Sequence, residues 1–399
     1  MTPYSEPQLT VRFENLGRET DRIVEYSIAS RYTQSTDAFD FTLQDSDRAN
    51  LIGLELEPVE LLLSSGEVSG AQQILGRIDV TEIGDMGKSV ICRGRDYLSD
   101  LVECHVDPTL KIEKDSTLAD AFAMATAPCG ITTIIPDDDV LLRNIRTGKT
   151  PGRAEKPDFA PVKLEEVTPQ RGQGIYDFLN RIAARNGCTL QPWSDRETLC
   201  LSKPDYAQEP LYSIQRNEDG SGANNVLKAR AVRDYSSVPT FILWNGKKTG
   251  GGNTAPLKIE KGVAETIAHM QAQEVYQNLQ DAAIPNRVKP QDGAPLNGKL
   301  YRLHTFEDTG SKTQEQLERV ATRAFSEHLK KALVYTVTMR GHADHFTGAL
   351  YCTNTTIQVQ DAIAGVNETL WIAARTFRYS RDAGAITELE CWQLGAFQL

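Results

Sequence analysis

Alternation of apolar and polar residues constrains the fold of this chain more than any other feature of the sequence. In the first hundred residues, apolar side chains alternate with polar ones over five short stretches, each bounded by Gly, Asp, Asn or Ser. This period is typical of strands with one buried face, and short strands at such spacing predict a small antiparallel barrel or sandwich. The positions are Leu9/Val11/Phe13, Val24/Tyr26/Ile28, Phe39/Phe41/Leu43, Val59/Leu61/Leu63 and Ile74/Ile78/Val80.

The same pattern returns in the last part of the chain and predicts a second β-rich body. Strands are predicted at 226–232, 239–244, 335–339, 356–360, 370–379 and 386–392. A glycine-rich tract, Gly246–Asn253, is expected to be a flexible connection. Helical periodicity, weak over 263–279 and strong over 316–329, indicates an inserted segment within this second body.

Between the two β-rich regions the period changes to that of helices. One helix is expected to begin at Asp115-Ser116, and a second carries Ile175, Phe178 and Ile182 on one face. A strand at 131–135 and a hairpin of 188–190 with 198–201 accompany them. The intervening stretch Arg146–Pro161 contains several Gly and Pro residues and is expected to run on the surface.

These patterns predict a β-rich α+β protein with two antiparallel β-barrel domains and α/β inserts. With 399 residues, the chain exceeds what one hydrophobic core usually covers. The expected domains are a first barrel at 1–104, an α/β domain at 105–205, a second barrel at 206–250 plus 335–399, and an inserted helix-containing domain at 251–334.

The charge is uneven along the chain. Residues 1–100 hold 9 Lys and Arg against 18 Asp and Glu, a balance of −9 within a total of −11. An acidic surface repels a phosphate backbone, so this region is not expected to bind nucleic acid. An ordinary solvated acidic surface is the simplest interpretation of this charge.

Cysteine usage and the start of the chain indicate a protein made in a reducing compartment. The seven cysteines include no CxxC pair, which favours scattered core thiols over a zinc site or a disulfide framework. The first residues lack the pattern of a secretion signal, and no apolar run approaches the roughly 20 residues of a spanning helix. We therefore expect cytoplasmic synthesis and no membrane anchor. The cysteines are Cys92, Cys104, Cys129, Cys188, Cys200, Cys352 and Cys391.

Three short motifs have the composition of chemical sites but not the spacing. His342-Ala343-Asp344-His345 resembles a metal motif, yet on a strand its two histidines point to opposite faces, and a loop between strands is the favoured interpretation. Gly148-Lys149-Thr150 ends like a phosphate-binding loop, but position 143 is Arg where that motif needs Gly. Cys188 and Cys200 lie in the predicted hairpin, which favours buried thiols over a nucleophile. No catalytic, cofactor-binding or metal-binding residue is predicted, and the chain is not expected to be an enzyme.

The segment Gly94–Cys104 resembles the "GR-x-x-x-x-DL-V-x-C" signature of Mu-like tail baseplate hub proteins, the late-control D family of phages. The helix at 174–187 is similar to that family's "F-L-x-R-L-A-x-x-x-G" helix. The segment 347–351 departs from the family, which usually has an aromatic-Arg-Pro sequence there. Other resembling stretches are Ser30-Arg31 with 37–45, 58–63 with 75–80, and 370–380 with 387–391.

The resemblance implies a structural hub of a contractile phage tail. It implies two tube-like β-barrels per subunit, so that a homotrimer forms a ring of six barrels and joins a three-fold central spike to a six-fold tail tube. Further implied partners are the tube or tube-initiator protein, the tape-measure protein and the surrounding baseplate wedge proteins. The virion baseplate is the expected location, after assembly in the host cytoplasm.

Two functional alternatives differ from this hub. A baseplate-associated lytic enzyme would need a compact, mostly helical catalytic domain, and the sequence predicts no helical block of that length. A spike or secretion-system spike would show a long repetitive β-helical tail, which is absent from this sequence.

For a hub, the acidic region suggests that DNA passes the lumen without specific binding, because like charge at the wall avoids retention. The residues expected to share in lining the lumen are Glu55, Glu57, Glu60, Glu67, Asp79, Glu82 and Asp85.

Overall fold

A computed structural model describes most of the chain as two compact units. One unit is Met1–Arg230 with Thr336–Cys391, and the other is Ala231–Tyr335 with Trp392–Leu399. Each unit is considered by itself. The described residues are 7–44, 53–84, 89–131, 133–136, 146–148, 167–185, 187–192, 195–219, 226–234, 236, 241–247, 256–262, 303–308, 323, 326–328 and 330–397.

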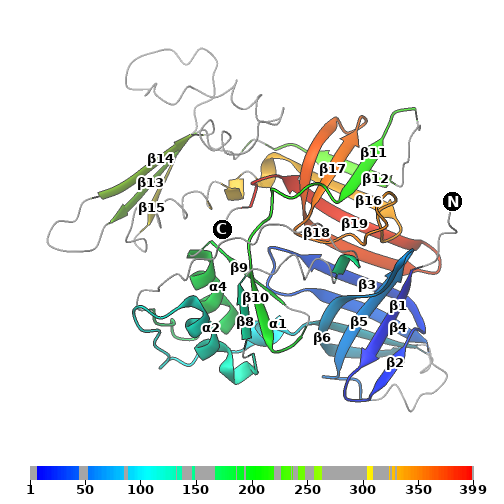
Figure 1. Cartoon of the computed structure of the whole chain (residues 1–399), viewed down its shortest axis with the longest axis horizontal. Helices are drawn as coiled ribbons and strands as arrows, with labels where there is room; N and C mark the ends of the chain where they lie inside the picture. The colour runs from blue at the N-terminus through cyan, green and yellow to red at the C-terminus, as the bar shows by residue number, and fades with distance from the viewer. Residues whose placement is uncertain are drawn as a thin grey trace. The chain divides into compact units, whose positions relative to one another are not determined.

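The N-terminal strands form a curled antiparallel body (Figure 1). They pair in the order β3-β4-β7-β6-β5-β1-β2, and every pairing is antiparallel. The predicted alternation is confirmed, because Val11, Phe41 and Leu61 are fully buried. The strands are β1 (Gln8–Phe13), β2 (Arg18–Thr20), β3 (Ile23–Arg31), β4 (Ala38–Gln44), β5 (Pro58–Ser65), β6 (Val68–Gly84) and β7 (Ser89–Asp96).

One apolar position of the predicted alternation is on the wrong face. Val80 was expected to be buried with Ile74 and Ile78, but its side chain is 48% exposed. The pairing of β6 with β7 shifts register between Ile78 and Val80, where an extra residue, Asp79, is inserted. A bulge of this kind moves the following side chains to the opposite face.

Strands from both ends of the chain share one sheet. β3 pairs with β18, placing Tyr26 opposite Tyr379 and Ala29 opposite Thr376. The result is a 13-stranded sheet that runs on through β18, β19, β16 and β12, with β11 and β17 beside it. The predicted strands at 226–232, 335–339, 356–360, 370–379 and 386–392 are confirmed, whereas the predicted strand at 239–244 belongs to a separate sheet. β11 is a further strand that was not predicted. The bounds are β11 (Tyr212–Arg216), β12 (Val226–Val232), β16 (Val334–Arg340), β17 (Thr356–Asp361), β18 (Val366–Ser380) and β19 (Gly384–Gln393).

The α/β module between them has a core of its own, which includes the fully buried Phe122, Phe178 and Leu199. Its three strands pair in the order β8-β10-β9. The two predicted helices and the hairpin are confirmed, and α1 is an additional short helix. The elements are α1 (Leu98–Glu103), α2 (Leu118–Thr126), the 3-10 helix η3 (Ala127–Cys129), β8 (Thr133–Pro136), α4 (Ile175–Arg185), β9 (Thr189–Pro192) and β10 (Thr198–Ser202).

The first predicted helix begins later than expected. Thr117, not Asp115 or Ser116, is its N-cap: the Thr117 hydroxyl accepts a hydrogen bond from the Asp120 amide at 3.1 Å. The Asp120 carboxylate in turn accepts one from the Thr117 amide at 3.0 Å. This reciprocal arrangement satisfies two backbone donors at once, which a cap at position 115 or 116 does not do.

The stretch that was predicted to run on the surface begins inside the protein. Arg146 is 7% exposed and Thr147 is fully buried. Their carbonyl groups accept hydrogen bonds from the Gln73 side chain at 3.0 Å and from the Leu350 amide at 3.2 Å. These partners replace the water that a surface loop would use, and so the segment 146–148 is buried in the first unit. Residues 149–161 lie outside the described residues.

The second unit contains a three-stranded sheet of β14 (Pro256–Gly262), β13 (Phe241–Lys247) and β15 (Leu303–Asp308), in that order. β13 pairs antiparallel with β14 and parallel with β15. Gly246 and Lys247, expected to be part of a flexible connection, belong instead to β13. The rest of that tract, 248–253, lies outside the described residues. The predicted helix at 263–279 lies outside the described residues, and 326–328 of the other are helical. No helix in the described ranges is long and apolar enough to cross a membrane.

Candidate functional site

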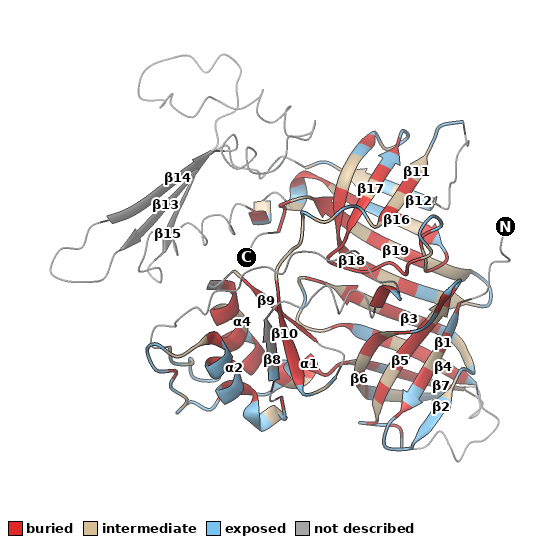
Figure 2. Ribbon diagram, viewed as in Figure 1, coloured by how far each residue is buried: buried red, intermediate tan, exposed pale blue. Residues whose placement is uncertain are grey.

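The exposed face of the central sheet carries rows of charged side chains. Because side chains alternate across a strand, the buried Tyr26 and Ile28 of β3 leave Glu25 and Ser27 on the other face. Ser27 lies opposite Arg378 of β18 on one side. Polar and charged residues of neighbouring strands thus meet in register over β18, β3, β4 and β7. The tan and pale-blue bands across the sheet in Figure 2 mark its partly and fully exposed residues.

Two further residues continue this row. Asp40 of β4 lies opposite Ser27 and also opposite Arg93 of β7. Burial raises the pKa of the Asp40 carboxyl, and the nearby Arg93 acts in the opposite direction.

Most arginines of this face are paired with a carboxylate. Arg31 donates two hydrogen bonds to Glu390, at 3.0 and 2.6 Å. Arg378 pairs with Glu388 at 3.3 Å, and Arg93 pairs with Glu82 at 3.2 Å. Exposed pairs of this kind contribute only about 0–1 kcal/mol to folding. Their main effect is to set the pattern of charge that the face presents.

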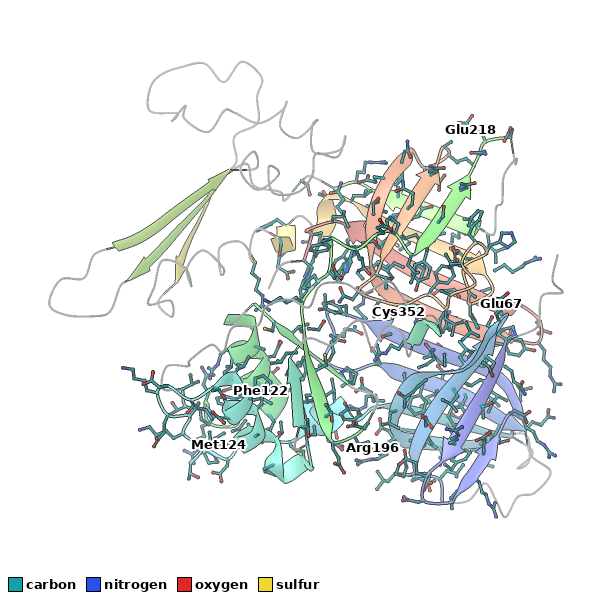
Figure 3. All side chains as sticks on the ribbon, in the orientation of Figure 1. Glu67, Phe122, Met124, Arg196, Glu218 and Cys352 are labelled. Atoms are coloured by element: carbon teal, nitrogen blue, oxygen red, sulfur yellow. The ribbon has the colours of Figure 1, made fainter. Side chains whose placement is uncertain are left out.

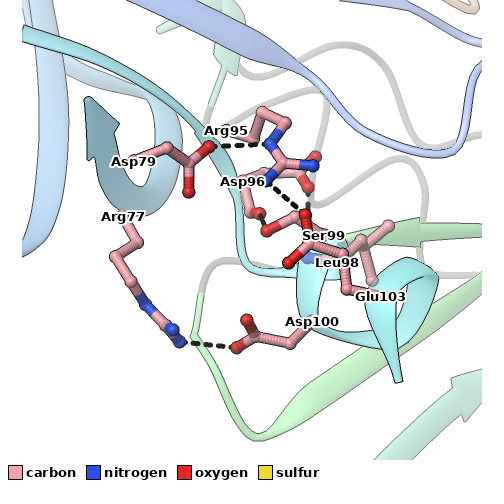
Figure 4. A network of polar contacts seen from close by, with 8 residues as sticks. All are labelled: Arg77, Asp79, Arg95, Asp96, Leu98, Ser99, Asp100 and Glu103. Carbon is pink, nitrogen blue, oxygen red and sulfur yellow. Dashed lines mark hydrogen bonds and ion pairs between the residues drawn. The ribbon is translucent and has the colours of Figure 1, made fainter. Parts of the chain in front are cut away.

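The Gly94–Cys104 motif continues from β7 into α1, and Figure 4 shows the ion pairs around it. Arg95 pairs with Asp79 at 2.7 Å and with Glu103 at 2.6 Å. These two hydrogen-bonded carboxylates raise the pKa of the Arg95 guanidinium. Arg77 of β6 pairs with Asp100 of α1 at 2.6 Å. The arginines on β6 and β7 therefore hold α1 against the end of the sheet.

Glycine is required at position 94 by close packing. A Cβ atom at Gly94 would lie 2.0 Å from the Arg77 carbonyl oxygen and 2.4 Å from the Phe39 ring. Gly76, on the neighbouring strand, is restricted in the same way by the Arg95 carbonyl oxygen at 2.2 Å. The first residue of the motif is thus explained by the approach of two backbones.

The structure separates the acids that were predicted to line a lumen. Asp79, Glu82 and Glu60 are each paired with an arginine; for Glu60 this is Arg12, at 3.0 Å. Glu57 is buried and accepts a hydrogen bond from the Leu16 amide at 3.1 Å, so it cannot face a channel. Glu55 and Glu67 are exposed, and Asp85 lies outside the described residues.

Beneath the charged face lies a buried polar centre around Arg375. Its guanidinium donates to the Gln73 side chain at 2.7 Å and to the Tyr351 carbonyl at 3.1 Å, and it lies 4.1 Å from the centre of the Phe377 ring. Within the described part of the chain, its Nε and Nη2 atoms have no hydrogen-bond partner. Burial lowers the pKa of Arg375.

A second buried cluster connects the barrel to the segment 146–148. Arg146 lies 3.7 Å from the Asp37 carboxylate, which accepts a hydrogen bond from the Ser30 hydroxyl at 2.6 Å. The Asp37 amide donates to Asp96 at 2.8 Å. Burial and the neighbouring Asp37 raise the pKa of Asp96 well above its ordinary value. The buried Arg146 therefore lies near two buried acids, and Arg375 also interacts electrostatically with Asp37.

The α/β module is attached to the barrel through polar contacts at its strand ends. Arg196, in the hairpin between β9 and β10, donates to the Gly76 carbonyl at 2.8 Å and pairs with Glu14 at 3.3 Å (Figure 3). The Tyr97 hydroxyl donates to the Thr198 carbonyl at 2.6 Å. Module and barrel are thus held at defined points within the first unit.

The histidine motif is structural. His342 is buried in the predicted loop between β16 and β17, and its ring nitrogens lie 2.9 Å from the Tyr26 hydroxyl and 3.0 Å from the Thr387 hydroxyl. Asp344 accepts hydrogen bonds from the Phe346 and Thr347 amides, which closes a turn. His342 and His345 therefore do not converge on one point.

The other motifs are also used in packing. Gly148 adopts a left-handed backbone and packs against Val68, where a Cβ atom would lie 2.2 Å from the Val68 side chain. Cys188 and Cys200 are buried. In the described ranges no group of three or more His, Cys, Asp and Glu side chains is placed to hold a metal ion.

Comparison with solved structures extends over nearly the whole chain. A tail protein from Neisseria meningitidis MC58 matches with a TM-score of 0.69 and 19% identity, over 98% of both chains. The 43 kDa tail protein of prophage MuSo2 from Shewanella oneidensis matches with a TM-score of 0.66 and 17% identity, over 98% of this chain and 99% of that one. This chain has the fold of phage tail proteins.

A more distant match is the Francisella PdpA–VgrG complex in its half-lidded form, with a TM-score of 0.56 and 11% identity, over 98% of this chain and 59% of that chain. No protein-family model and no curated protein matches the sequence. The likeness to the tail proteins confirms, at the level of the fold, the resemblance seen in the Gly94–Cys104 motif. The Arg375 centre was not predicted from the sequence, because Arg375 and Gln73 are 302 positions apart in the chain.

Proposed function

We propose that this chain is a structural hub subunit of a phage-type tail baseplate. The observation that carries the proposal is the match to two phage tail proteins over 98% of this chain. An additional catalytic domain would leave a large share of the chain without a counterpart in these tail proteins, whereas only about 2% of the chain is unmatched. The residues of the motifs that could have formed a chemical site, such as His342, Cys188 and Cys200, are buried and take part in packing. This favours a structural role over a lytic one.

The proposed assembly is a homotrimer that joins a three-fold spike to a six-fold tube in the virion. A trimer suits this task if each subunit supplies two β bodies of similar kind, and both ends of this chain supply strands to the sheet. Its partners would be the central spike, the tube or tube-initiator protein, the tape-measure protein and the wedge proteins.

Subunit counting in purified particles tests this assembly. Quantitative mass spectrometry of tails should give equal copy numbers for this chain and the trimeric spike protein, and twice as many tube subunits per ring. A twofold excess of this chain over the spike would contradict the trimer. Its absence from tails would contradict the whole proposal.

We further propose that the charged face of β3, β4, β7 and β18 lines the channel through which DNA leaves. Arginines on this face are paired with carboxylates, and Glu25 and Asp40 add negative charge, so phosphate finds few unpaired cations there. Replacing Glu25 and Asp40 together by Lys should leave assembly intact and slow DNA release at low salt. Unchanged release kinetics would argue against this lining.

A further inference from the structure

Arg375 of β18 is the most deeply buried arginine or lysine among the residues that the structure describes, and only 1% of it is exposed. One of its nitrogen atoms, Nη1, donates to the Gln73 side chain at 2.7 Å and to the Tyr351 carbonyl at 3.1 Å. The guanidinium carbon lies over the Phe377 ring, 4.1 Å from its centre. The remaining donors of the group are therefore those on Nε and Nη2.

Nε and Nη2 form one edge of the planar guanidinium, with two N–H bonds that point the same way and can share one acceptor. Neither atom has a hydrogen-bond partner in the described ranges, and both are closed to solvent. Buried donors in native proteins are nearly always paired, and burying a cation without an acceptor costs more than burying a neutral group. The described residues leave this edge of Arg375 without the acceptor that its burial calls for.

The buried acids nearby do not fully offset the charge of Arg375. Asp37 acts on Arg375 electrostatically, but its carboxylate accepts a hydrogen bond from the Ser30 hydroxyl at 2.6 Å. The same carboxylate lies 3.7 Å from a second buried cation, Arg146. Burial and the neighbouring Asp37 raise the pKa of Asp96 well above its ordinary value, which favours the uncharged form of Asp96. The two buried arginines thus depend mainly on one carboxylate, and positive charge remains at the centre.

We propose that Arg375 binds a chloride ion through its Nε and Nη2 atoms. A single-atom anion accepts both N–H bonds at once and offsets the remaining positive charge. A water molecule accepts the same two bonds but brings no charge, and the burial of this edge excludes a larger anion such as phosphate. Because solvent does not reach the edge, the ion enters when the strands open and is enclosed when they close. Its binding to the folded chain therefore adds to the stability of the fold.

Urea denaturation of the purified full-length chain tests this site, with sodium chloride exchanged for sodium gluconate at constant ionic strength. Above the dissociation constant, tenfold more chloride should raise the folding equilibrium constant of the parent by about tenfold. Arg375→Met removes the charge and both donors and should lose this dependence. Arg378→Met is the matched control on β18, since it removes an exposed arginine that pairs with Glu388, and it should keep the dependence. The same chloride dependence in Arg375→Met as in the parent would overturn the proposal.

A direct measurement on the parent chain decides the matter if Arg375→Met does not fold. Crystals grown in sodium bromide should show an anomalous scattering peak within hydrogen-bonding distance of both Nε and Nη2 of Arg375, because bromide is only slightly larger than chloride. An ordered water molecule at this edge, or no peak beside it, would contradict the site. Neither measurement needs an assembled tail, so failure here leaves the proposed hub function untouched.

Discussion

At the scale of single residues, Gly94 is the position where sequence motif and packing coincide most clearly. The Arg77 carbonyl oxygen and the Phe39 ring occupy the place of a side chain. Gly94→Ala should therefore destabilise the protein by about 1–3 kcal/mol through overpacking. Gly84→Ala is the matched control on the same strand pair, since its nearest neighbour is the Ser89 hydroxyl at 3.2 Å. Urea denaturation of both variants measures the difference, and equal midpoints would contradict the packing argument.

A second residue-scale prediction concerns His342, whose pKa burial lowers to about 3. The folded protein keeps this ring neutral, so its contribution to stability is fully present above pH 6.5 and is lost as pH falls toward 3. The expected loss is about 1.4 kcal/mol per pH unit within that window. His342→Gln should show a shallower fall in unfolding free energy between pH 6.5 and 4 than the parent protein. The exposed His345→Gln should behave like the parent, and an unchanged slope for His342→Gln would refute the assignment.

At the scale of elements, the segment 146–148 is held in the first unit mainly by buried polar contacts. Arg146→Ala removes the cation beside two buried acids and should cost roughly 3 kcal/mol, since a broken buried pair leaves charge unpaired. Arg93→Ala, which removes the exposed pair with Glu82, should cost about 1 kcal/mol or less. Comparing the two unfolding free energies checks this, and a smaller loss for Arg146→Ala than for Arg93→Ala would contradict it.

Individual strands and helices could be predicted from the sequence where one face of the element is buried and the other is exposed to solvent. The strands β1, β3, β4 and β5 follow from period two, and α4 follows from its apolar face. β7 was not among the predicted alternating strands, because two of its four buried positions hold Gly94 and Asp96 rather than apolar side chains. The capping box at Thr117 was missed because Asp replaces the usual Glu at its third position.

Pairings between distant segments could not be predicted. Arg31 and Glu390 are 359 positions apart, and the contact between Arg375 and Gln73 spans 302 positions. Both depend on β3 pairing with β18, which no local pattern specifies, since register is set by the whole buried face. The burial of Arg146 could not be predicted for the same reason. The glycines and prolines of Arg146–Pro161 indicate a loop but do not say whether other segments cover it.

At the scale of the whole molecule, the proposed hub function requires that three copies of the chain meet around the tail axis. The proposed ring has three subunits and six β bodies, and its motive is that both ends of one chain are rich in strands. The matches over 98% of the chain show the tail-protein fold and leave the number of copies to be measured. Of the acids predicted to line the channel, Glu55 and Glu67 are exposed, whereas Glu60, Asp79 and Glu82 are paired with arginines and Glu57 is buried. Collective charge matters here, because a single exposed acid is screened within about 8 Å at physiological salt.

An averaged cryo-electron microscopy map of the tail tip tests this account most directly. It should place three copies of the chain between spike and tube, with β3 and β18 beside the lumen and a wall of paired arginines and excess carboxylates. A ring built from six separate copies at this level, or a position away from the tail axis, would contradict the account.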